Sequence, residues 1–461
     1  MTQKKQRINN KFFWLALLFF FALSTRLLRL NFPTQTYFDE AYHVPAARLI
    51  ATNDQRAYEW WHEPIAGDDY HDWLHPPLAK FIQAGSILVF GDNAWGWRLP
   101  SAVFGSFLVL ALYFLAKEIF LSVLDEKKSH QVALTAAALL SLDGLPLVQS
   151  RIAMNDVMAT FWMAAALLFI TRWQLKIWLF KIDRFREKQT LLTRGSHLNL
   201  ILSGLFVGLA LGTKWSGLLL LIFLLFVVAV SAIGKKLWKL LPLVIFSLII
   251  LPLTIYVSSY TQMFAQGKSL EDFVQLHRQI IWYQTHRDAS HEYNSLPYEW
   301  VLNYRPVWYW TQEKVVVTPT GVATPTIRTT ANIYALGNPV IHLLAMVVLI
   351  YQLGWMVNYW SDTDVFRHRL ALIMLYLLFW IPWFFSPRII FYHLYLPALI
   401  GLSMIMARFM ISFYNSRTKW IYWALFSLIF ISFVVFYPHW TGVKVAQSWA
   451  ERVYFAIPSW R

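Results

Sequence analysis

Residues 198–233 read LNLILSGLFVGLALGTKWSGLLLLIFLLFVVAVSAI, and this nearly continuous apolar stretch decides the fold class. As a single helix it would be ~54 Å long at about 1.5 Å per residue, whereas the hydrocarbon core of a bilayer is about 30 Å thick. The segment Gly212-Thr213-Lys214-Trp215-Ser216-Gly217 interrupts the run near its middle. We therefore predict two short membrane-spanning helices joined by a tight turn.

Comparable apolar runs fill most of the 461-residue chain, which is 57% hydrophobic and only 14% charged. A soluble domain would carry about a quarter charged residues, and an apolar helix of about 20 residues can cross a bilayer. We predict a single all-α integral membrane domain over residues 1–461, with about eleven transmembrane helices. The predicted spans are 12–30, 98–119, 131–149, 156–173, 198–213, 216–233, 240–258, 339–357, 369–385, 393–413 and 420–437.

The basic residues predict the orientation of these spans. Lys127 and Lys128 follow the second span, Arg417 and Lys419 precede the last, and both clusters fall on one side of an eleven-span arrangement. Short loops rich in lysine and arginine remain in the cytoplasm, so we predict a cytoplasmic N-terminus and an external C-terminus. The net charge of +15 then reflects these loops and anionic lipid headgroups rather than a nucleic-acid partner.

Two long segments, 31–97 and 259–338, are predicted to face outward. Within the first, the apolar run from Leu78 to Phe90 is too short to span a bilayer, so we predict an interfacial helix. The second contains Pro, Trp and Tyr among polar residues and is predicted to be an ordered outer loop. The chain has no cysteine, which excludes disulfides and thiolate chemistry.

Ionisable residues cluster at the predicted outer ends of the spans. Charges at membrane depth are costly and are therefore usually paired or functional, so a site at the outer face is expected. The candidates are Asp39, Glu40, His75, Lys80, Arg98, Arg151, Asp156, Lys214, Arg388 and His393.

The acids in this set have both functional and structural interpretations. Asp39 and Glu40 lie among aromatic residues, where one could act as a general base with a shifted pKa, or both could be solvated or arginine-paired loop acids. Arg151 and Asp156 are five residues apart in one loop and could instead form an ion pair that holds this loop.

The cations likewise have two interpretations. Lys80 follows His75-Pro76-Pro77 on the first turns of a short helix, where it could hold a phosphate or simply extend towards the headgroups. Arg98, Arg388 and His393 could each anchor a helix at the interface, but together they would suit a phosphodiester leaving group.

Four histidines in the first outer segment raise the possibility of a metal site. Their spacing matches no familiar ligand pattern, so we predict no catalytic metal. These histidines are His43, His62, His71 and His75.

Eight segments in this order resemble the protein O-mannosyltransferase family of the GT-C superfamily, whose donor is a polyprenyl-phosphate mannose. They span residues 38 to 400. The segment 259–338 is too short for the MIR domain of eukaryotic members, so the bacterial branch is the nearer resemblance. The segments are FDEAYHVPAARLI, HPPLAKFI, WGWRLPSAVFG, SRIAMNDVMATFW, GTKWSG, RPVWYW, GNPV and PRIIFYHLYLPAL.

The resemblance implies a GT-C fold with Asp39 as the catalytic base, Glu40 beside it and Asp156 in a second acidic motif. It further implies a polyprenyl-phosphate-mannose co-substrate and inversion at the sugar. The residues expected to bind the lipid phosphate or to support the site are His75, Lys80, Arg98, Arg151, Lys214, Arg388, Tyr392 and His393.

The resemblance also implies a cellular location and binding partners. We expect a multi-pass protein of the bacterial plasma membrane, with its site on the non-cytoplasmic side. The expected acceptor is a Ser/Thr-containing polypeptide, which the secretion machinery could deliver. Three alternatives remain: a related transferase of the aminoarabinose type acting on a lipid or glycan, a transporter or flippase, and a non-catalytic scaffold.

Overall fold

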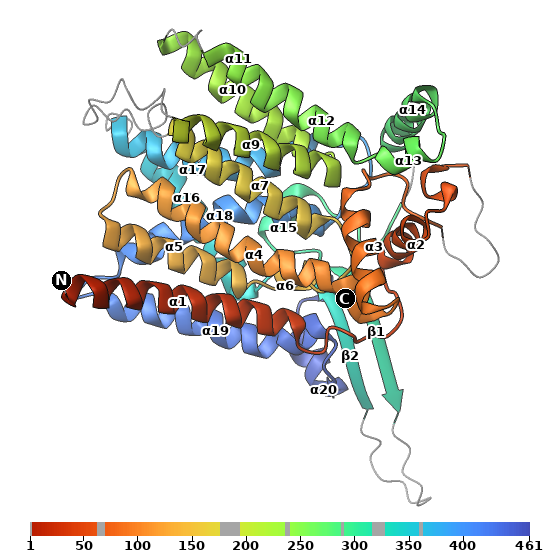
Figure 1. Cartoon of the computed structure of the whole chain (residues 1–461). Coiled ribbons are helices and arrows are strands. Elements are labelled where there is room, and N and C mark those ends of the chain that lie inside the picture. The colour runs from red at the N-terminus through yellow and green to blue at the C-terminus, as the bar shows by residue number, and fades with distance from the viewer. Residues whose placement is uncertain are drawn as a thin grey trace, which may run out of the picture.

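The computed structural model describes residues 2–61, 70–175, 194–235, 240–286, 290–315, 328–358 and 363–461. Long helices lie side by side in one bundle, with the N-terminus at its left end in Figure 1 and the C-terminus towards the right. The helices are α1 (Thr2–Leu27), α2 (Glu40–Ala51), α3 (Leu78–Phe90), α4 (Ala94–Leu121), α5 (Glu126–Ser141), α6 (Gly144–Gln149), α7 (Asp156–Ile170), α9 (Arg194–Thr213), α10 (Gly217–Lys235), α11 (Leu241–Ile245), α12 (Leu251–Ser258), α13 (Thr261–Ala265), α14 (Leu270–His286), α15 (Pro297–Val301), α16 (Pro339–Asn358), α17 (Thr363–Trp380), α18 (Leu399–Ser412), α19 (Lys419–Thr441) and α20 (Gln447–Trp449).

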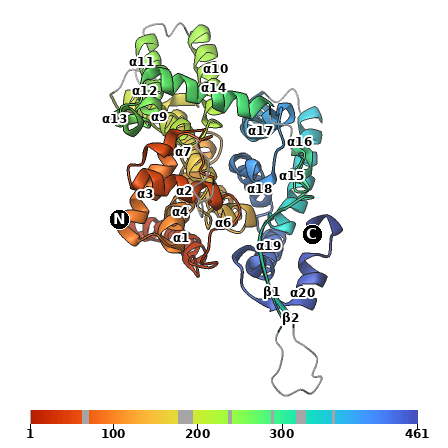
Figure 2. The ribbon, with the colours of Figure 1, turned by 90° about the vertical axis from the view of Figure 1, so that its right-hand side faces the viewer.

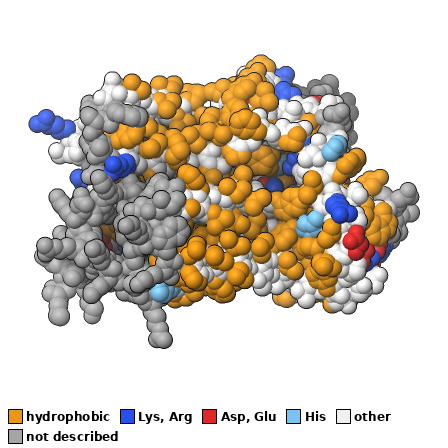
Figure 3. All heavy atoms as spheres, turned by 90° about the horizontal axis from the view of Figure 1, so that it is seen from above, with side chains coloured by type: hydrophobic (Ala, Val, Ile, Leu, Met, Phe, Trp, Pro, Cys, Tyr) orange, Lys and Arg blue, Asp and Glu red, His pale blue; other side chains and the backbone are white. Residues whose placement is uncertain are grey.

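Seven helices in the described part of the chain are long and apolar enough to cross a membrane, which makes this an integral membrane protein. Hydrophobic side chains cover the middle of the bundle, whereas charged and histidine side chains lie towards its ends (Figure 3). The seven are Ala94–Leu121, Asp156–Trp173, Leu241–Ser258, Pro339–Asn358, Val365–Phe385, Tyr392–Ser412 and Lys419–Thr441. The shorter apolar helices are Phe12–Leu27, Leu78–Phe90, His197–Thr213 and Gly217–Ala229.

The turn predicted within the opening stretch is present, because α9 ends at Thr213 and α10 begins at Gly217. The short helix predicted from Leu78 to Phe90 is also present as α3. It lies with α2, α13 and α14 at the right-hand end of the bundle in Figure 1, beyond the long helices. Leu88, Val89 and Phe90 are exposed at the C-terminal end of α3, as expected of a helix that rests against lipid.

The helix predicted to run unbroken over 131–149 is interrupted, because the chain forms α5 up to Ser141 and the separate helix α6 from Gly144. The Asp143 carboxylate caps α6 by accepting a hydrogen bond of 2.9 Å from the Leu145 backbone N–H. A side chain at Gly144 would lie 2.2 Å from the Leu336 carbonyl oxygen and from the Trp440 ring. The break is therefore set by close packing against distant segments.

The all-α prediction is incomplete, since the 259–338 segment contains two strands. β1 (Val307–Val315) pairs antiparallel with β2 (Arg328–Ala335), and β2 also pairs with the short β3 (Val445–Ala446). The hairpin projects from the bundle in Figures 1 and 2. Its base is anchored by buried residues, including Val307 and Tyr309.

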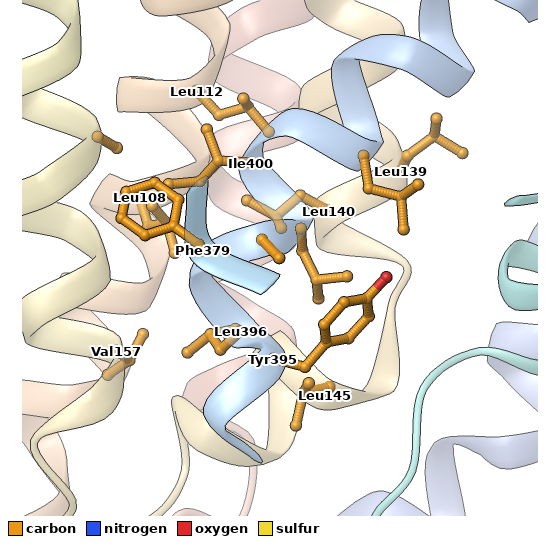
Figure 4. Packing of buried hydrophobic residues seen from close by; sticks show 14 of the residues in the cluster. Leu108, Leu112, Leu139, Leu140, Leu145, Val157, Phe379, Tyr395, Leu396 and Ile400 are labelled. Carbon is orange, nitrogen blue, oxygen red and sulfur yellow. The ribbon is translucent and has the colours of Figure 1, made fainter. Parts of the chain in front are cut away.

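The apolar core lies where α4, α5, α7 and α18 meet, and it holds these helices in fixed positions relative to one another. Its side chains interdigitate in Figure 4, and close packing of this kind resists rotation of one helix against another. Residues labelled there are Leu108, Leu112, Leu139, Leu140, Leu145, Val157, Phe379, Tyr395, Leu396 and Ile400. The start of α7, which carries Asp156, is thereby held in place for the site.

Candidate active site

A pocket gathers ionisable side chains that are far apart in the sequence. Figure 2 looks onto this end of the bundle, with α1 to α7 on one side and α16 to α19 on the other. Six of the predicted site residues line the pocket, so the helix ends and loops that carry them lie close together. The lining residues are Asp39, His43, His75, Met154, Asp156, Lys214, Tyr283, Arg388, Ile389, Phe391, His393 and Leu394.

Glu40, predicted as catalytic, does not line the pocket but is fully buried against Arg98. Its carboxylate accepts hydrogen bonds from Arg98 Nε at 2.7 Å and from the second guanidinium nitrogen at 2.8 Å. It also accepts a hydrogen bond of 2.9 Å from the Ala153 backbone N–H. The remaining Arg98 donors bind backbone carbonyls, among them Pro33 at 2.6 Å. The predicted direct roles of Glu40 and Arg98 in the site are thus corrected to a buried ion pair that joins α2, α4 and the loop before α7.

Asp39 differs from its neighbour because its carboxylate faces the pocket. Within the described part of the chain, no side chain donates a hydrogen bond to it. The protein surrounds it on most sides, and this burial raises the pKa of Asp39 to about 6, with His43 and Lys214 opposing the rise and Asp156 adding to it. A carboxylate with a pKa near the working pH is well suited to act as a general base.

Asp156 and Lys214 form an ion pair in the pocket, with Lys214 Nζ 2.7 Å from Asp156 Oδ1. Asp156 opens α7, where the helix dipole favours a carboxylate. Lys214 stands in the turn between α9 and α10, so the interruption of the long apolar stretch delivers a cation to the site.

Arg151 does not pair with Asp156, and that structural alternative is wrong. Its guanidinium instead donates to the backbone carbonyls after α1, including those of Arg26 at 2.7 Å and Leu28 at 2.8 Å. Arg151 is buried outside the pocket. Its predicted phosphate contact is therefore corrected to a structural role, in which its hydrogen bonds stabilise the C-terminal end of α1.

Lys80 and Tyr392 also lie outside the pocket lining. Lys80 is buried beside Asp72, donates to the carbonyls of Asp72 and His75, and stands 3.2 Å from Asp72 Oδ2. The Tyr392 hydroxyl lies 3.0 Å from His342 Nε2. Lys80 therefore supports the segment that carries His75, whereas Tyr392 contacts His342 outside the pocket. Their predicted phosphate contacts are corrected accordingly.

Tyr283 and Phe391 line the pocket but were not predicted from the sequence. Tyr283 comes from α14 in the second outer segment and packs edge-on against Trp73, with ring centroids 5.6 Å apart. It belongs to no motif, and only its position in an amphipathic helix of that segment could have indicated it. From the sequence, His43 is indicated only as a possible metal ligand.

One group in the described residues has the composition of a metal site: His43, Asp72 and His75, whose ligand atoms lie within 4.8 Å of one another. The ammonium of Lys80 already stands beside the same carboxylate, and a second cation there would be repelled. His62 lies outside the described residues, and the predicted absence of a catalytic metal stays a prediction.

Two family models together match nearly the whole chain. Residues 16–265 match dolichyl-phosphate-mannose-protein mannosyltransferase, and residues 269–457 match the C-terminal four-transmembrane region of protein O-mannosyltransferase. The chain belongs to the protein O-mannosyltransferase family. It is therefore a glycosyltransferase enzyme.

Curated relatives carry the same family name. The polyprenol-phosphate-mannose–protein mannosyltransferase of Corynebacterium glutamicum is 25% identical over 97% of this chain and 93% of its own length. The protein of that name from Mycobacterium tuberculosis is 25% identical over 95% of this chain and 90% of its own length.

Solved structures share the fold of this mannosyltransferase. The Pmt1–Pmt2 protein O-mannosyltransferase complex of S. cerevisiae, bound to the sugar donor, matches with a TM-score of 0.75 at 13% identity, over 96% of this chain and 92% of that chain. ArnT from Cupriavidus metallidurans, bound to undecaprenyl phosphate, matches with a TM-score of 0.56 at 14% identity, over 92% and 70%. These similarities agree with a GT-C arrangement of the membrane helices.

Proposed function

We propose that this mannosyltransferase moves mannose from a polyprenyl-phosphate-mannose to Ser or Thr hydroxyls of a polypeptide, with inversion at the sugar. The family models and the names of the curated relatives support the donor and the protein acceptor. The observation that carries the mechanism is the contrast between Asp39, whose carboxylate faces the pocket, and Glu40, whose carboxylate is bound by Arg98.

In the proposed reaction the Asp39 carboxylate accepts the proton of the acceptor hydroxyl. The hydroxyl oxygen forms a bond to the anomeric carbon as the bond from that carbon to the phosphate oxygen breaks. The electron pair of the broken bond leaves with polyprenyl phosphate. A single displacement of this kind inverts the anomeric centre.

The cations of the pocket would stabilise the leaving phosphate. Lys214 and Arg388 both line the pocket, and Lys214 is held by Asp156. Fixed charges aimed at a developing anion are usually a large contribution to catalysis. Asp156 would thus act on Lys214 rather than on the sugar, as a residue that positions a cation.

The proposed setting is the plasma membrane of a bacterium, with the pocket on the non-cytoplasmic side. We propose one GT-C unit over residues 1–461 with eleven spans and a cytoplasmic N-terminus, in which 31–97 and 259–338 face outward and no MIR domain is present. Because the chain has no cysteine, a single cysteine at position 39, 156 or 127 can be labelled uniquely. Labelling of 39 and 156 from outside, and of 127 only after permeabilisation, is expected.

The enzymatic proposal is tested by transfer of labelled mannose from lipid donor to a Ser/Thr peptide in purified membranes. Asp39→Asn is expected to reduce the rate by about 10²- to 10⁴-fold, as is usual when a general base is removed. Asp92→Asn is the matched control, because Asp92 lies in an exposed pair with Arg48. Full transfer by folded Asp39→Asn would remove the base assignment.

The same assay separates the competing functions. A transporter or flippase would form no mannosylated peptide, and an aminoarabinose-type transferase would modify a lipid or glycan acceptor instead. The anomeric configuration of the product, read by NMR, should be opposite to that of the donor.

A further inference from the structure

Beside the proposed base, the Asp72 carboxylate lies between two histidines of the pocket and hydrogen-bonds to one of them, His75. His75 Nδ1 lies 3.0 Å from Asp72 Oδ1, and His43 Nδ1 lies 3.1 Å from Oδ2. The Asp72 side chain is only 4% exposed. Because His43 belongs to α2 and His75 to the segment before α3, one carboxylate pairs with side chains from two parts of the first outer segment.

The charge of Asp72 is matched by Lys80 of α3, whose Nζ is 3.2 Å from Oδ2. Burial alone would raise the pKa of the Asp72 carboxyl, but His75, Lys80 and His43 together hold that pKa well below its ordinary value. Asp72 is therefore ionised, and an ionised carboxylate can only accept hydrogen bonds.

The His75 imidazole, whose Nδ1 lies within hydrogen-bond distance of Asp72 Oδ1, must then carry its proton on Nδ1. Burial lowers the pKa of His75, an effect that Asp72 opposes only in part, so this ring is neutral at neutral pH. A neutral imidazole protonated on Nδ1 has a hydrogen-bond acceptor at Nε2. Both rings line the pocket, with centroids 5.6 Å apart, and therefore offer it two neighbouring imidazoles, of which His75 presents an acceptor at Nε2.

Two neighbouring imidazoles suit a ligand with two hydroxyl groups, because a hydroxyl can both donate and accept a hydrogen bond. A phosphodiester carries no proton to donate, and Lys214 and Arg388 are better suited to it. The side chain of a Ser or Thr acceptor has one hydroxyl, which Asp39 takes in the proposed reaction. A hexose presents several hydroxyls close together.

We propose that His43 and His75, oriented by Asp72, form a subsite that binds two hydroxyl groups of the donor hexose. This inference rests on the proposed function and adds to it the residues that recognise the sugar. Asp72 is a positioning residue, because it acts through the two histidines.

The test uses a polyprenyl-phosphate-mannose donor and its 2-, 3-, 4- and 6-deoxy analogues with the full-length enzyme. One neutral hydrogen bond corresponds to a change of about 2- to 10-fold, so kcat/KM should fall by that factor for two analogues. Loss of a hydroxyl also changes the intrinsic reactivity of the sugar. That change is common to all variants and cancels when the ratio of analogue to native donor is compared.

His75→Asn keeps an amide donor near the Nδ1 position but removes the Nε2 acceptor, whereas His75→Gln places an amide near the Nε2 position. We expect His75→Asn to lower kcat/KM for the native donor by about 2- to 10-fold. For the one analogue that lacks the hydroxyl bound by His75, the same substitution should cause no further loss of kcat/KM. His75→Gln should retain part of the discrimination. His43→Asn should behave in the same way towards a different analogue, and Asp72→Asn should weaken both preferences.

His277→Asn is the matched control, because His277 is partly buried against Tyr256 outside the pocket. Its deoxy ratios should equal those of the native enzyme. Equal penalties for all four analogues in the native enzyme, or unchanged ratios in His75→Asn and His43→Asn, would overturn the sugar subsite. Absence of any mannose transfer by the native enzyme would instead overturn the proposed function.

Discussion

Replacing Glu40 by glutamine tests whether this acid is structural rather than catalytic. Glu40 is fully buried and accepts two hydrogen bonds from Arg98, one from the Ala153 N–H, and one of 3.3 Å from the Tyr37 N–H. Every partner is a donor. Glutamine keeps the shape but converts one acceptor oxygen into an NH₂ group, which must then face a donor.

The magnitude follows from the charge that is left behind. Arg98 would remain buried without its carboxylate, and breaking a buried pair in this way costs about 3–5 kcal/mol. That cost corresponds to a loss of roughly a hundred- to a few-thousand-fold in the ratio of folded to unfolded protein. Asp92→Asn breaks the Arg48 pair, whose side chains are 38% and 46% exposed, and should cost about 0–1 kcal/mol.

Both variants would be purified in the same detergent and unfolded by heating while tryptophan fluorescence is recorded. Glu40→Gln should unfold at a clearly lower temperature than the native enzyme, and Asp92→Asn should unfold close to it. If Glu40→Gln unfolds at the same temperature as Asp92→Asn but abolishes mannose transfer, Glu40 acts in the chemistry and the structural reasoning is wrong.

Three further predictions address the pocket and its supports. Since the pKa of Asp39 is raised to about 6 and the base must be deprotonated, the transfer rate should rise with pH through about 6; a rate profile flat across that range would exclude Asp39 as the titrating base. A strong chelator should leave the initial rate unchanged, because Lys80 stands beside the carboxylate of the one metal-like group in the described residues; a loss restored by added metal would contradict this. Gly337→Ala should destabilise the fold by about 1–3 kcal/mol, because the new Cβ would lie 2.1 Å from His342 Nε2 and 2.6 Å from the Tyr392 hydroxyl; a melting temperature equal to that of Gly354→Ala, where the surrounding space is open, would refute the packing argument.

Much of the helical arrangement follows from local hydropathy. The predicted span 98–119 lies within α4, and the interruption at Lys214 separates α9 from α10. Both features could be predicted because they depend on the length of an apolar run and on turn residues within the same stretch of sequence. The break at Asp143 could not be predicted in this way. It depends on Leu336 and Trp440, which approach Gly144 from distant segments.

The site was predictable as a set of residues at one end of the bundle, but not residue by residue. Topology alone brings Asp39, Asp156 and Lys214 to the same end. Whether a given side chain turns into the pocket depends on its rotation about its own helix and on its partners. Arg98 and Lys80 are therefore at the right depth but turn inward to buried carboxylates, which a single sequence does not reveal.

The two adjacent acids show how this rotation creates a function. Asp39 is the N-cap of α2 and Glu40 is its first residue, and successive residues of a helix project about 100° apart at 3.6 residues per turn. Glu40 consequently points to Arg98 within the protein, while Asp39 points into the pocket. The ion pair between Glu40 and Arg98 fixes the start of α2. The Asp39 side chain is therefore held in a defined direction, although its own oxygens are not bound by any side chain that the structure describes. A general base must be held in place and yet remain free to accept a proton. Glu40 holds the start of the helix in place, and Asp39 can therefore remain free to accept the proton.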